Sequence, residues 1–230
     1  MKNFLYWYYE NKAFKAFISG DYPKAEELFQ KMEEKFRDRI DIGHNIGLVR
    51  LAMKDYERAE TSFLKEINDY GETLGRMRVL GDLYYAWGKA AKAKKAYESA
   101  LENAASERSP SKETDIFFIK KRIEICSSEE VFELAGKAES EIEKGVQLLA
   151  AKQCDEAYEH FEKALAFDPI CFPAINNMGV IALNNRKDYT DAIMRFKEVC
   201  KISSNPQAKR NLEHAEKAKK EAEKIKNKKT

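Results

Sequence analysis

Apolar residues recur at helical spacing along most of the chain, in pairs of segments joined by a short polar turn. One segment carries Ile46, Val49 and Met53, and another carries Leu28 and Met32. Intervals of three, four and seven residues place side chains on one face of an α-helix. The turn between paired segments reads Gly or Lys followed by Asp-Tyr in its clearest copies, which predicts that each pair forms a helical hairpin.

The hairpins repeat with a period close to 34 residues. In each unit an alanine stands four residues before an aromatic residue, and the aromatic residues are spaced by 34, 34, 64 and 35 positions. The interval of 64 predicts a short, degenerate unit between the third complete hairpin and the next one. The alanine and aromatic pairs are Ala25 and Phe29, Ala59 and Phe63, Ala93 and Tyr97, Ala157 and Phe161, and Ala192 and Phe196.

A second series of small residues has the same period. Ala13, Gly47, Gly81 and Gly145 each stand twelve positions before an alanine of the first series, whereas Gly179 stands thirteen before its alanine. The last hairpin therefore carries one extra residue, which we expect within 184–188. A small residue lets two helices approach closely, so that the aromatic ring can interlock across the pair. Such a hairpin buries its apolar faces only by stacking on its neighbours.

These residues resemble the tetratricopeptide repeat family, whose period is 34 residues. The resemblance covers most of residues 6–205 and implies an all-α fold. That fold is a right-handed superhelix, an α–α solenoid of stacked helical hairpins with a C-terminal capping helix. The clearest copies of the family motif contain Leu80, Gly81, Tyr84, Ala93, Tyr97 and Ala100, and Gly145, Ala157, Phe161, Ala164 and Pro169. The departures are Lys12 and Lys144 in place of leucine, and Glu66 in place of a small residue.

The two series divide the chain into four parts. We expect three hairpins over residues 1–107, a degenerate helical unit over 108–137, two hairpins over 138–205, and a basic capping helix and tail over 206–230. In the degenerate unit, Ser127 and Glu130 have the spacing of a capping box that opens a helix. Residues 206–230 contain nine bases and four acids, a net charge of +5, and a narrow apolar stripe typical of a terminal cap.

Charge and hydropathy disfavour several classes of partner. The net charge is +2, from 41 basic and 39 acidic residues, which argues against nucleic-acid binding through bulk charge. The apolar stretch at 4–9 is shorter than a secretory core of about 7–15 residues or a membrane span of about 20. The four cysteines form no CxxC pair, which indicates reduced thiols. We therefore expect a cytoplasmic protein that does not bind membranes.

Sequence motifs for catalysis are absent. HExxH, CxxC, GxGxxG, GxSxG and the phosphate-binding GxxxxGK[ST] do not occur. Aromatic residues at helical spacing are typical of a core rather than of a cofactor pocket. We expect no catalytic residue, metal, cofactor or small-molecule substrate. The interpretation is a non-catalytic adaptor or scaffold that binds a protein or peptide partner.

The resemblance also implies where the partner binds, because in this family the first helix of each repeat lines an inner groove. Tyr85 is the expected anchor, since aromatic residues on groove walls often carry binding energy. The apolar members of the set can instead pack against neighbouring repeats, and Arg78 and Asp82 can pair with each other at a spacing of four. The implied groove residues are Phe14, His44, Asn45, Leu48, Arg78, Asp82, Tyr85, Val146, Asn176, Asn177 and Val180.

Some members of this family clamp the C-terminal carboxylate of heat-shock chaperones with Lys, Arg and Asn side chains. Asn45 and Asn177 match the asparagine of the second repeat in that clamp. The positions that need basic side chains hold Glu10, Gly75 and Val79 in the first three repeats. A clamp for two carboxylates would lack its positive charge, so we do not expect a co-chaperone.

Two further roles remain open. The stretch FLYWYY at 4–9 is an apolar end with no polar cap before it, which favours a structural subunit that self-associates through its N-terminal aromatic end or another solenoid surface. The chain can also be a regulatory subunit of an enzyme encoded elsewhere. The basic tail is a candidate site for an acidic partner, although its interleaved glutamates and its lack of aromatic residues weaken an RNA or membrane interpretation.

Overall fold

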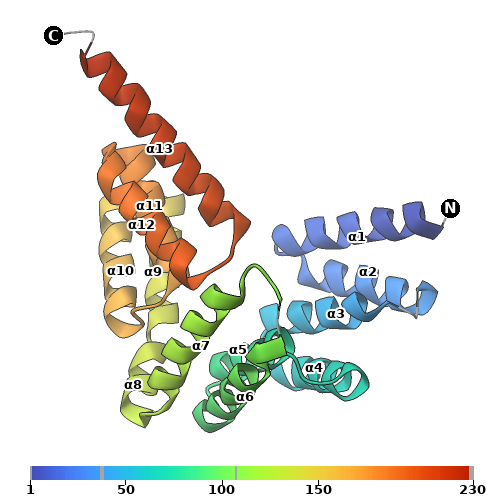
Figure 1. The fold of residues 1–230 in the computed structure, drawn as a ribbon. Helices are drawn as coiled ribbons and strands as arrows, with labels where there is room; N and C mark the ends of the chain where they lie inside the picture. Colours follow the sequence, from blue (N-terminus) through green and yellow to red (C-terminus); the bar gives the residue numbers. More distant parts are fainter. Residues whose placement is uncertain (1, 37–38, 107, 228–230) are drawn as a thin grey trace. The chain divides into compact units, whose positions relative to one another are not determined.

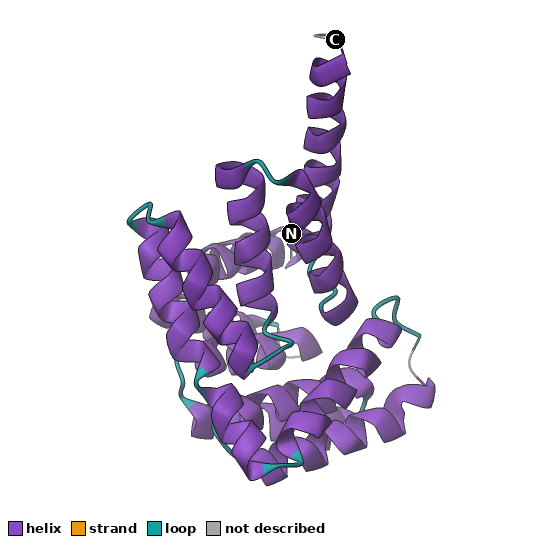
Figure 2. Cartoon of the chain, turned by 90° about the vertical axis from the view of Figure 1, so that its left-hand side faces the viewer, coloured by secondary structure: helices purple, strands orange, loops and turns teal. Residues whose placement is uncertain are grey.

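The computed structural model describes residues 2–36, 39–106 and 108–227, and across these ranges the chain forms helices joined by short connections, with no strand (Figures 1 and 2). The chain folds into two compact units, Met1–Glu107 (unit 1) and Arg108–Thr230 (unit 2). The expected all-α solenoid of helical hairpins is confirmed within these units. None of the helices in the described ranges is long and apolar enough to cross a membrane.

Unit 1 consists of three stacked hairpins. Each contains a first and a second helix that pack antiparallel to each other, and the second helix of one hairpin packs on the first helix of the next. The pairs are α1 (Lys2–Ile18) with α2 (Tyr22–Lys35), α3 (Ile40–Ala52) with α4 (Tyr56–Tyr70), and α5 (Leu74–Ala86) with α6 (Ala90–Glu102). A short 3-10 turn, Asn103–Ser106, follows α6.

The turn inside each hairpin has a fixed geometry. Its key residue has a positive φ and stands five positions before the alanine of the repeat, as at Gly20 and Lys54. The next residue caps the second helix in several repeats, and the Asp21 and Asp55 side chains accept backbone N–H groups of the first turn. The Gly/Lys-Asp sequence therefore combines a left-handed residue with a helix cap.

The series of small residues is explained by a close approach of an aromatic ring. A Cβ atom added at Gly47 would lie 2.5 Å from the Phe63 ring, and one added at Gly145 would lie 2.6 Å from the Phe161 ring. Both distances are shorter than carbon atoms tolerate without movement of the ring. The second helix thus packs its aromatic residue directly on the backbone of the first helix, as the sequence pattern predicts.

Polar contacts with the same period join the hairpins of unit 1. Glu26 in α2 accepts a hydrogen bond from Nε of Arg50 in α3 at 2.8 Å. Thirty-four positions later, Glu60 in α4 accepts one from the Tyr84 hydroxyl in α5 at 2.6 Å. The equivalent position in the third hairpin is Lys94, so the acidic series ends with the last hairpin of unit 1.

Unit 2 contains two further hairpins and three additional helices. The hairpins pair α9 (Ala138–Ala150) with α10 (Cys154–Phe167), and α11 (Phe172–Ile181) with α12 (Tyr189–Ile202). The extra residue of the last hairpin is taken up by a π-helical turn, Ala182–Arg186, which begins two residues before the predicted range. The additional helices are α7 (Lys112–Cys126), α8 (Glu129–Gly136) and α13 (Pro206–Asn227).

The degenerate unit of the sequence forms α7 and α8. Helix α7 packs against α12, and the Arg122 guanidinium in α7 forms a buried ion pair with Asp168 at 2.7 Å. The expected capping box is wrong by one residue, because Ser128 caps α8 through a bond from the Val131 N–H. Ser127 instead ends α7 and donates its hydroxyl proton to the Ile123 carbonyl.

Candidate functional site

The first helices of unit 1, α1, α3 and α5, form a face that we call the first-helix face. Residues at equivalent positions of the repeat lie on it, so the side chains can be compared between repeats. Directly after the small residue stand Phe14, Leu48 and Asp82. The fold requires the small residue and the aromatic residue of each repeat, whereas these positions vary from aromatic to aliphatic to acidic. Their variation leaves them free to serve recognition.

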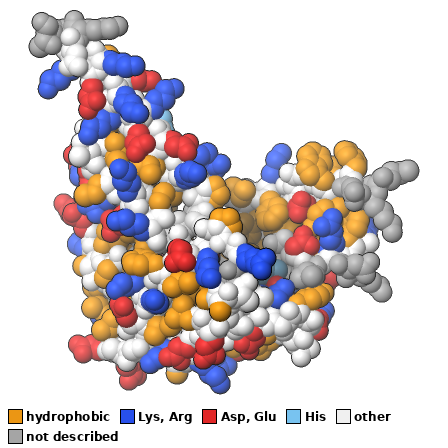
Figure 3. All heavy atoms as spheres, in the orientation of Figure 1, with side chains coloured by type: hydrophobic (Ala, Val, Ile, Leu, Met, Phe, Trp, Pro, Cys, Tyr) orange, Lys and Arg blue, Asp and Glu red, His pale blue; other side chains and the backbone are white. Residues whose placement is uncertain are grey.

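Helix α1 is the most apolar part of this face. The side chains of Trp7 and Ile18 are 57% and 83% exposed, and Phe14 is 40% exposed although its ring meets the Phe29 ring edge-on at 5.4 Å between centroids. Figure 3 shows hydrophobic side chains at the surface over this helix. Large apolar side chains that remain in water contribute little to the fold, so their presence points to a contact surface.

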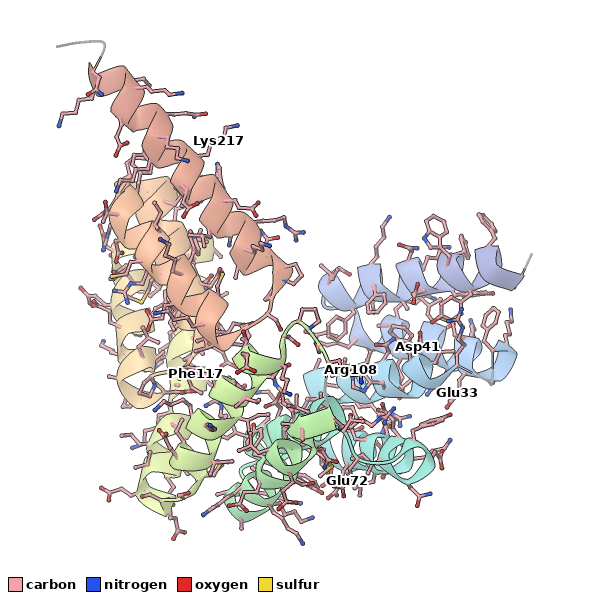
Figure 4. The ribbon with its side chains drawn as sticks, in the orientation of Figure 1. Glu33, Asp41, Glu72, Arg108, Phe117 and Lys217 are labelled. Atoms are coloured by element: carbon pink, nitrogen blue, oxygen red, sulfur yellow. The ribbon has the colours of Figure 1, made fainter. Side chains whose placement is uncertain are left out.

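Between α3 and α5 the face has a shallow, open hollow whose lining residues are mostly polar or charged. The hollow has a volume of about 560 Å³ and is lined by His44, Asn45 and Asp41. Asp41 lies at the start of α3 (Figure 4). Nδ1 of His44 lies 2.8 Å from Glu66 Oε2, and Nε of Arg76 lies 3.0 Å from Glu66 Oε1. Glu66, the departure from the repeat motif, therefore ties the second hairpin to the third beneath this hollow.

The charge state of Glu66 reflects two opposing effects. Burial alone would raise the pKa of this carboxyl, but the hydrogen bonds and positive charge from His44 and Arg76 lower it below its usual range. Glu66 is thus held as a carboxylate and orients the imidazole that lines the hollow.

Leu48, a predicted groove residue further along α3, is half-buried.

On α5 the predicted residues largely contact each other and the core. Nε of Arg78 lies 3.7 Å from Asp82 Oδ2, as the spacing of four predicts, and Asp82 also accepts a hydrogen bond from the Tyr97 hydroxyl at 2.7 Å. Tyr85, the expected anchor, is half-buried and its hydroxyl oxygen is buried. Tyr85 therefore offers a partner less surface than Trp7 does.

In unit 2 the equivalent positions are divided between solvent and the last helix. Val146 in α9 is 47% exposed. Asn176 in α11 accepts a hydrogen bond from the Asn211 side chain of α13 at 3.1 Å, and Val180 packs against an apolar cluster that includes Ala215 of α13. Asn177 lines a small hollow of about 200 Å³ beside the start of α13. The capping helix thus takes up part of the surface that the sequence assigned to a partner.

Several exposed residues of α1 are missing from the groove set that the sequence implied, Phe4 and Ile18 among them. Phe4 is 69% exposed, and Ile18 is the most exposed large apolar residue described. A signal for Ile18 was available, because the equivalent positions hold Ala52 and Ala86 in the next two repeats. A large aliphatic residue where other repeats have alanine is not required by the fold.

Other hollows lie on the side of unit 1 formed by the second helices. One of about 340 Å³ is lined by polar residues of α3 and α4, including Arg50, Thr61 and Ser62. A second, one repeat further on, lies between α5 and α6. Within the ranges that the structure describes, no group of three or more His, Cys, Asp or Glu side chains could hold a metal ion. Burial raises the pKa of the Cys171 thiol to about 11, which keeps it a neutral thiol.

Helical hairpins with a 34-residue period, each closed by an aromatic ring on a small residue, define a tetratricopeptide-repeat fold, and the chain has this fold. No protein-family model matches it, and no curated protein matches it. Solved structures with similar architecture include yeast Tom70, at 18% identity and a TM-score of 0.47 over 94% of this chain and 40% of that chain. The chain thus spans two fifths of the length of Tom70.

Two other similar structures are closer in length. A mutant form of MamA is 17% identical, with a TM-score of 0.40 over 88% of this chain and 100% of that chain. YrrB, a TPR protein with an unusual peptide-binding site, is 17% identical, with a TM-score of 0.40 over 91% of this chain and 90% of that chain. At these identities and scores the likenesses carry no argument about function.

Proposed function

We propose that the protein is a non-catalytic adaptor that binds a peptide or helix of a partner protein on the first-helix face of unit 1. The observation that carries this proposal is the hollow between α3 and α5, which is lined by His44 and Asn45. Polar groups in a concave surface fix the orientation of a bound ligand.

Stacking of another repeat on the free side of α1 is a poorer explanation of the apolar N-terminal segment. The residues of α3 that pack on the first hairpin are Ile42, Ile46 and Val49, each at most 4% exposed. Their equivalents in α1 are Tyr8, Lys12 and Lys15, and both lysines are exposed. Burial of two unpaired ammonium groups would cost several kcal/mol, so this side of α1 is suited to solvent.

The proposal is tested by affinity capture from the native cell extract with an Asn45→Arg variant. The new side chain would project a long cation into the hollow between α3 and α5, and we expect the captured partner to be lost. Thr61→Arg is the matched control, because Thr61 is an exposed polar residue of α4 that does not line this hollow. Capture of the same partner by all three proteins would place its binding outside the hollow and contradict the proposal.

A further inference from the structure

Helix α1 carries an outward stripe of five residues, Phe4, Trp7, Asn11, Phe14 and Ile18, which we call the α1 stripe. Successive members are separated by three, four, three and four positions, the spacing of a coiled-coil seam. Tyr6 and Ala13, which face the core of unit 1, are 8% and 0% exposed. The four apolar members of the stripe are 40% to 83% exposed. We propose that the α1 stripe pairs in parallel with the α1 stripe of a second copy of this chain.

The stripe is not a requirement of the repeat. At the position of Trp7, the next two hairpins have Asp41 and Gly75, and at the position of Ile18 they have alanine. Those hairpins fold with the same interlock of small and aromatic residues. The large apolar residues of α1 therefore serve something other than the closure of the hairpin, and a contiguous exposed stripe of this kind marks an interface.

The polar member of the stripe supports a helix-to-helix contact with a defined register. Asn11 lies at its centre, and its side-chain amide donates a hydrogen bond to the Trp7 carbonyl at 2.8 Å. The side-chain carbonyl and the second N–H of Asn11 point away from that bond and can pair with Asn11 of the other copy. One asparagine in an otherwise apolar seam lowers affinity but selects register and the number of strands.

The charged residues beside the stripe select a second copy and a parallel orientation. Glu10 borders the stripe on one side, and Lys15 borders it five positions later on the other side. In a parallel pair related by a twofold axis, Glu10 of each copy meets Lys15 of the other copy, which forms two equivalent ion pairs. In an antiparallel twofold pair centred on Asn11, Glu10 of one copy would instead meet Glu10 of the other. The charge pattern therefore favours the parallel pair.

The expected dimer is weak. The stripe extends over little more than two heptads, which places the contact at the small end of specific interfaces. Helix α1 is already ordered because it packs on α2. Association therefore does not have to supply the free energy of helix formation. We expect reversible dimerisation at concentrations of about 10–100 µM, in the range of transient contacts.

Sedimentation equilibrium from about 1 to 300 µM, a range that brackets a weak interface, measures this association. The mass should rise from 26.6 kDa toward twice that value. Trp7→Glu and Ile18→Glu should each keep the protein monomeric while circular dichroism shows an unchanged helix content, because both side chains are exposed. Leu64→Glu, at a residue of α4 that is 43% exposed, is the matched control and should dimerise like the wild type. A monomeric wild type over the whole range would overturn the proposal.

A charge swap tests the parallel orientation. Glu10→Lys and Lys15→Glu should each weaken the dimer by about three- to tenfold, and the double variant should recover the affinity of the wild type. An antiparallel pair would show no recovery, because like charges would still meet. Ile18→Cys should form an intermolecular disulfide under oxidation, whereas Leu64→Cys should not. Dimerisation without recovery or cross-linking would refute the parallel arrangement.

The partner-binding proposal is tested separately from this one. Asn45→Arg places a cation in the hollow but leaves the α1 stripe intact, and we expect it to dimerise like the wild type. If the wild type captures its partner but does not dimerise, only the proposal of self-pairing is refuted. Normal dimerisation with capture unaffected by Asn45→Arg would remove only the proposed adaptor site.

Discussion

Unit 1 and unit 2 contain the same kind of helical hairpin, but different contacts stabilise the packing of helices inside each unit. In unit 1 an acidic side chain recurs with the period of the repeat, and solvent still reaches the pairs that it forms; the Arg50 and Glu26 side chains are 18% and 12% exposed. In unit 2 a helix outside the repeat series, α7, covers α12 and contributes an ion pair whose partners, Arg122 and Asp168, are 10% and 7% exposed.

The difference shows two ways to complete a hairpin that cannot bury its own faces. A further hairpin of the same kind can do so, and its contacts then repeat with the sequence period. A helix of unrelated sequence can also do so, and then a specific buried pair sets its position. Removal of one partner of a deeply buried pair leaves an uncompensated charge, so unit 2 should respond more sharply to a single substitution.

The largest expected effect is that of Arg122→Ala. The substitution leaves the Asp168 carboxylate buried without its guanidinium, which should lower the free energy of unfolding of unit 2 by about 3–5 kcal/mol. Both tryptophans, Trp7 and Trp87, lie in unit 1. Urea unfolding should therefore show an earlier transition by circular dichroism and an unchanged transition by tryptophan fluorescence.

The matched control for that variant removes both charges. Arg122→Met combined with Asp168→Leu should cost less than Arg122→Ala, because no charge remains buried. Equal shifts of the fluorescence and circular dichroism transitions in Arg122→Ala would contradict the comparison, since the two units would then unfold together.

A smaller effect is expected for Glu26→Gln in unit 1. The variant weakens the charge-assisted hydrogen bond from Arg50 and should lower the free energy of unfolding by about 1–2 kcal/mol. Glu27→Gln is the neighbouring control, because Glu27 is exposed and pairs with the exposed Lys24 and Lys31, so its effect should be much smaller. Tryptophan fluorescence during urea unfolding reports both variants, and equal effects would show that the repeated contact adds nothing to stacking.

The smallest expected effect is a pH dependence caused by Glu66. Its pKa is lower in the folded protein than in the unfolded chain, so its stabilising contribution is complete above the unfolded value of about 4.3 and is lost as pH falls through the folded value. The stability difference between the wild type and Glu66→Gln should shrink as pH falls from about 5 to about 3. A difference that stays constant over this range would show that Glu66 acts through packing rather than through its charge.

The stacked hairpins could be predicted from the sequence because every repeat needs the same residue types at the same positions. A small residue beneath an aromatic ring is needed at every hairpin, and Gly47 and Phe63 satisfy it as Gly145 and Phe161 do. The position of the extra residue in the last hairpin was also predicted to within two residues, because a break in a regular series is easy to locate.

Contacts that occur only once were not open to prediction. The sequence of α7 shows a helix with two apolar faces, but neither its packing on α12 nor its long-range ion pair from Arg122 to Asp168, at the end of α10, follows from that pattern. In the same way, α13 was expected as a cap, but its hydrogen bond to Asn176 was not. Ser127 and Ser128 are adjacent potential caps, and the end of α7 decides which one is used.

The candidate site, too, could be predicted only in part from the sequence. The sequence placed His44 and Asn45 on the first helices, because their positions in the repeat define the face. It did not separate side chains that reach solvent from those that pack: Trp7 is exposed, whereas Tyr85 is half-buried with its hydroxyl inside. Exposure depends on which neighbouring helix covers a position, and that neighbour is distant in the chain.

By itself, the sequence determined the helices, their pairing into hairpins and the 34-residue period, because local spacing and close packing impose the same residues in every copy. Only the tertiary structure decided that α7 covers α12, that Glu66 joins two hairpins beneath a hollow, and that α13 takes up part of the predicted groove. These outcomes depend on single contacts between distant residues, for which a repeating pattern contains no signal. The apolar α1 stripe could be predicted in part. Its spacing is visible in the sequence, but its exposure depends on how α1 packs in unit 1.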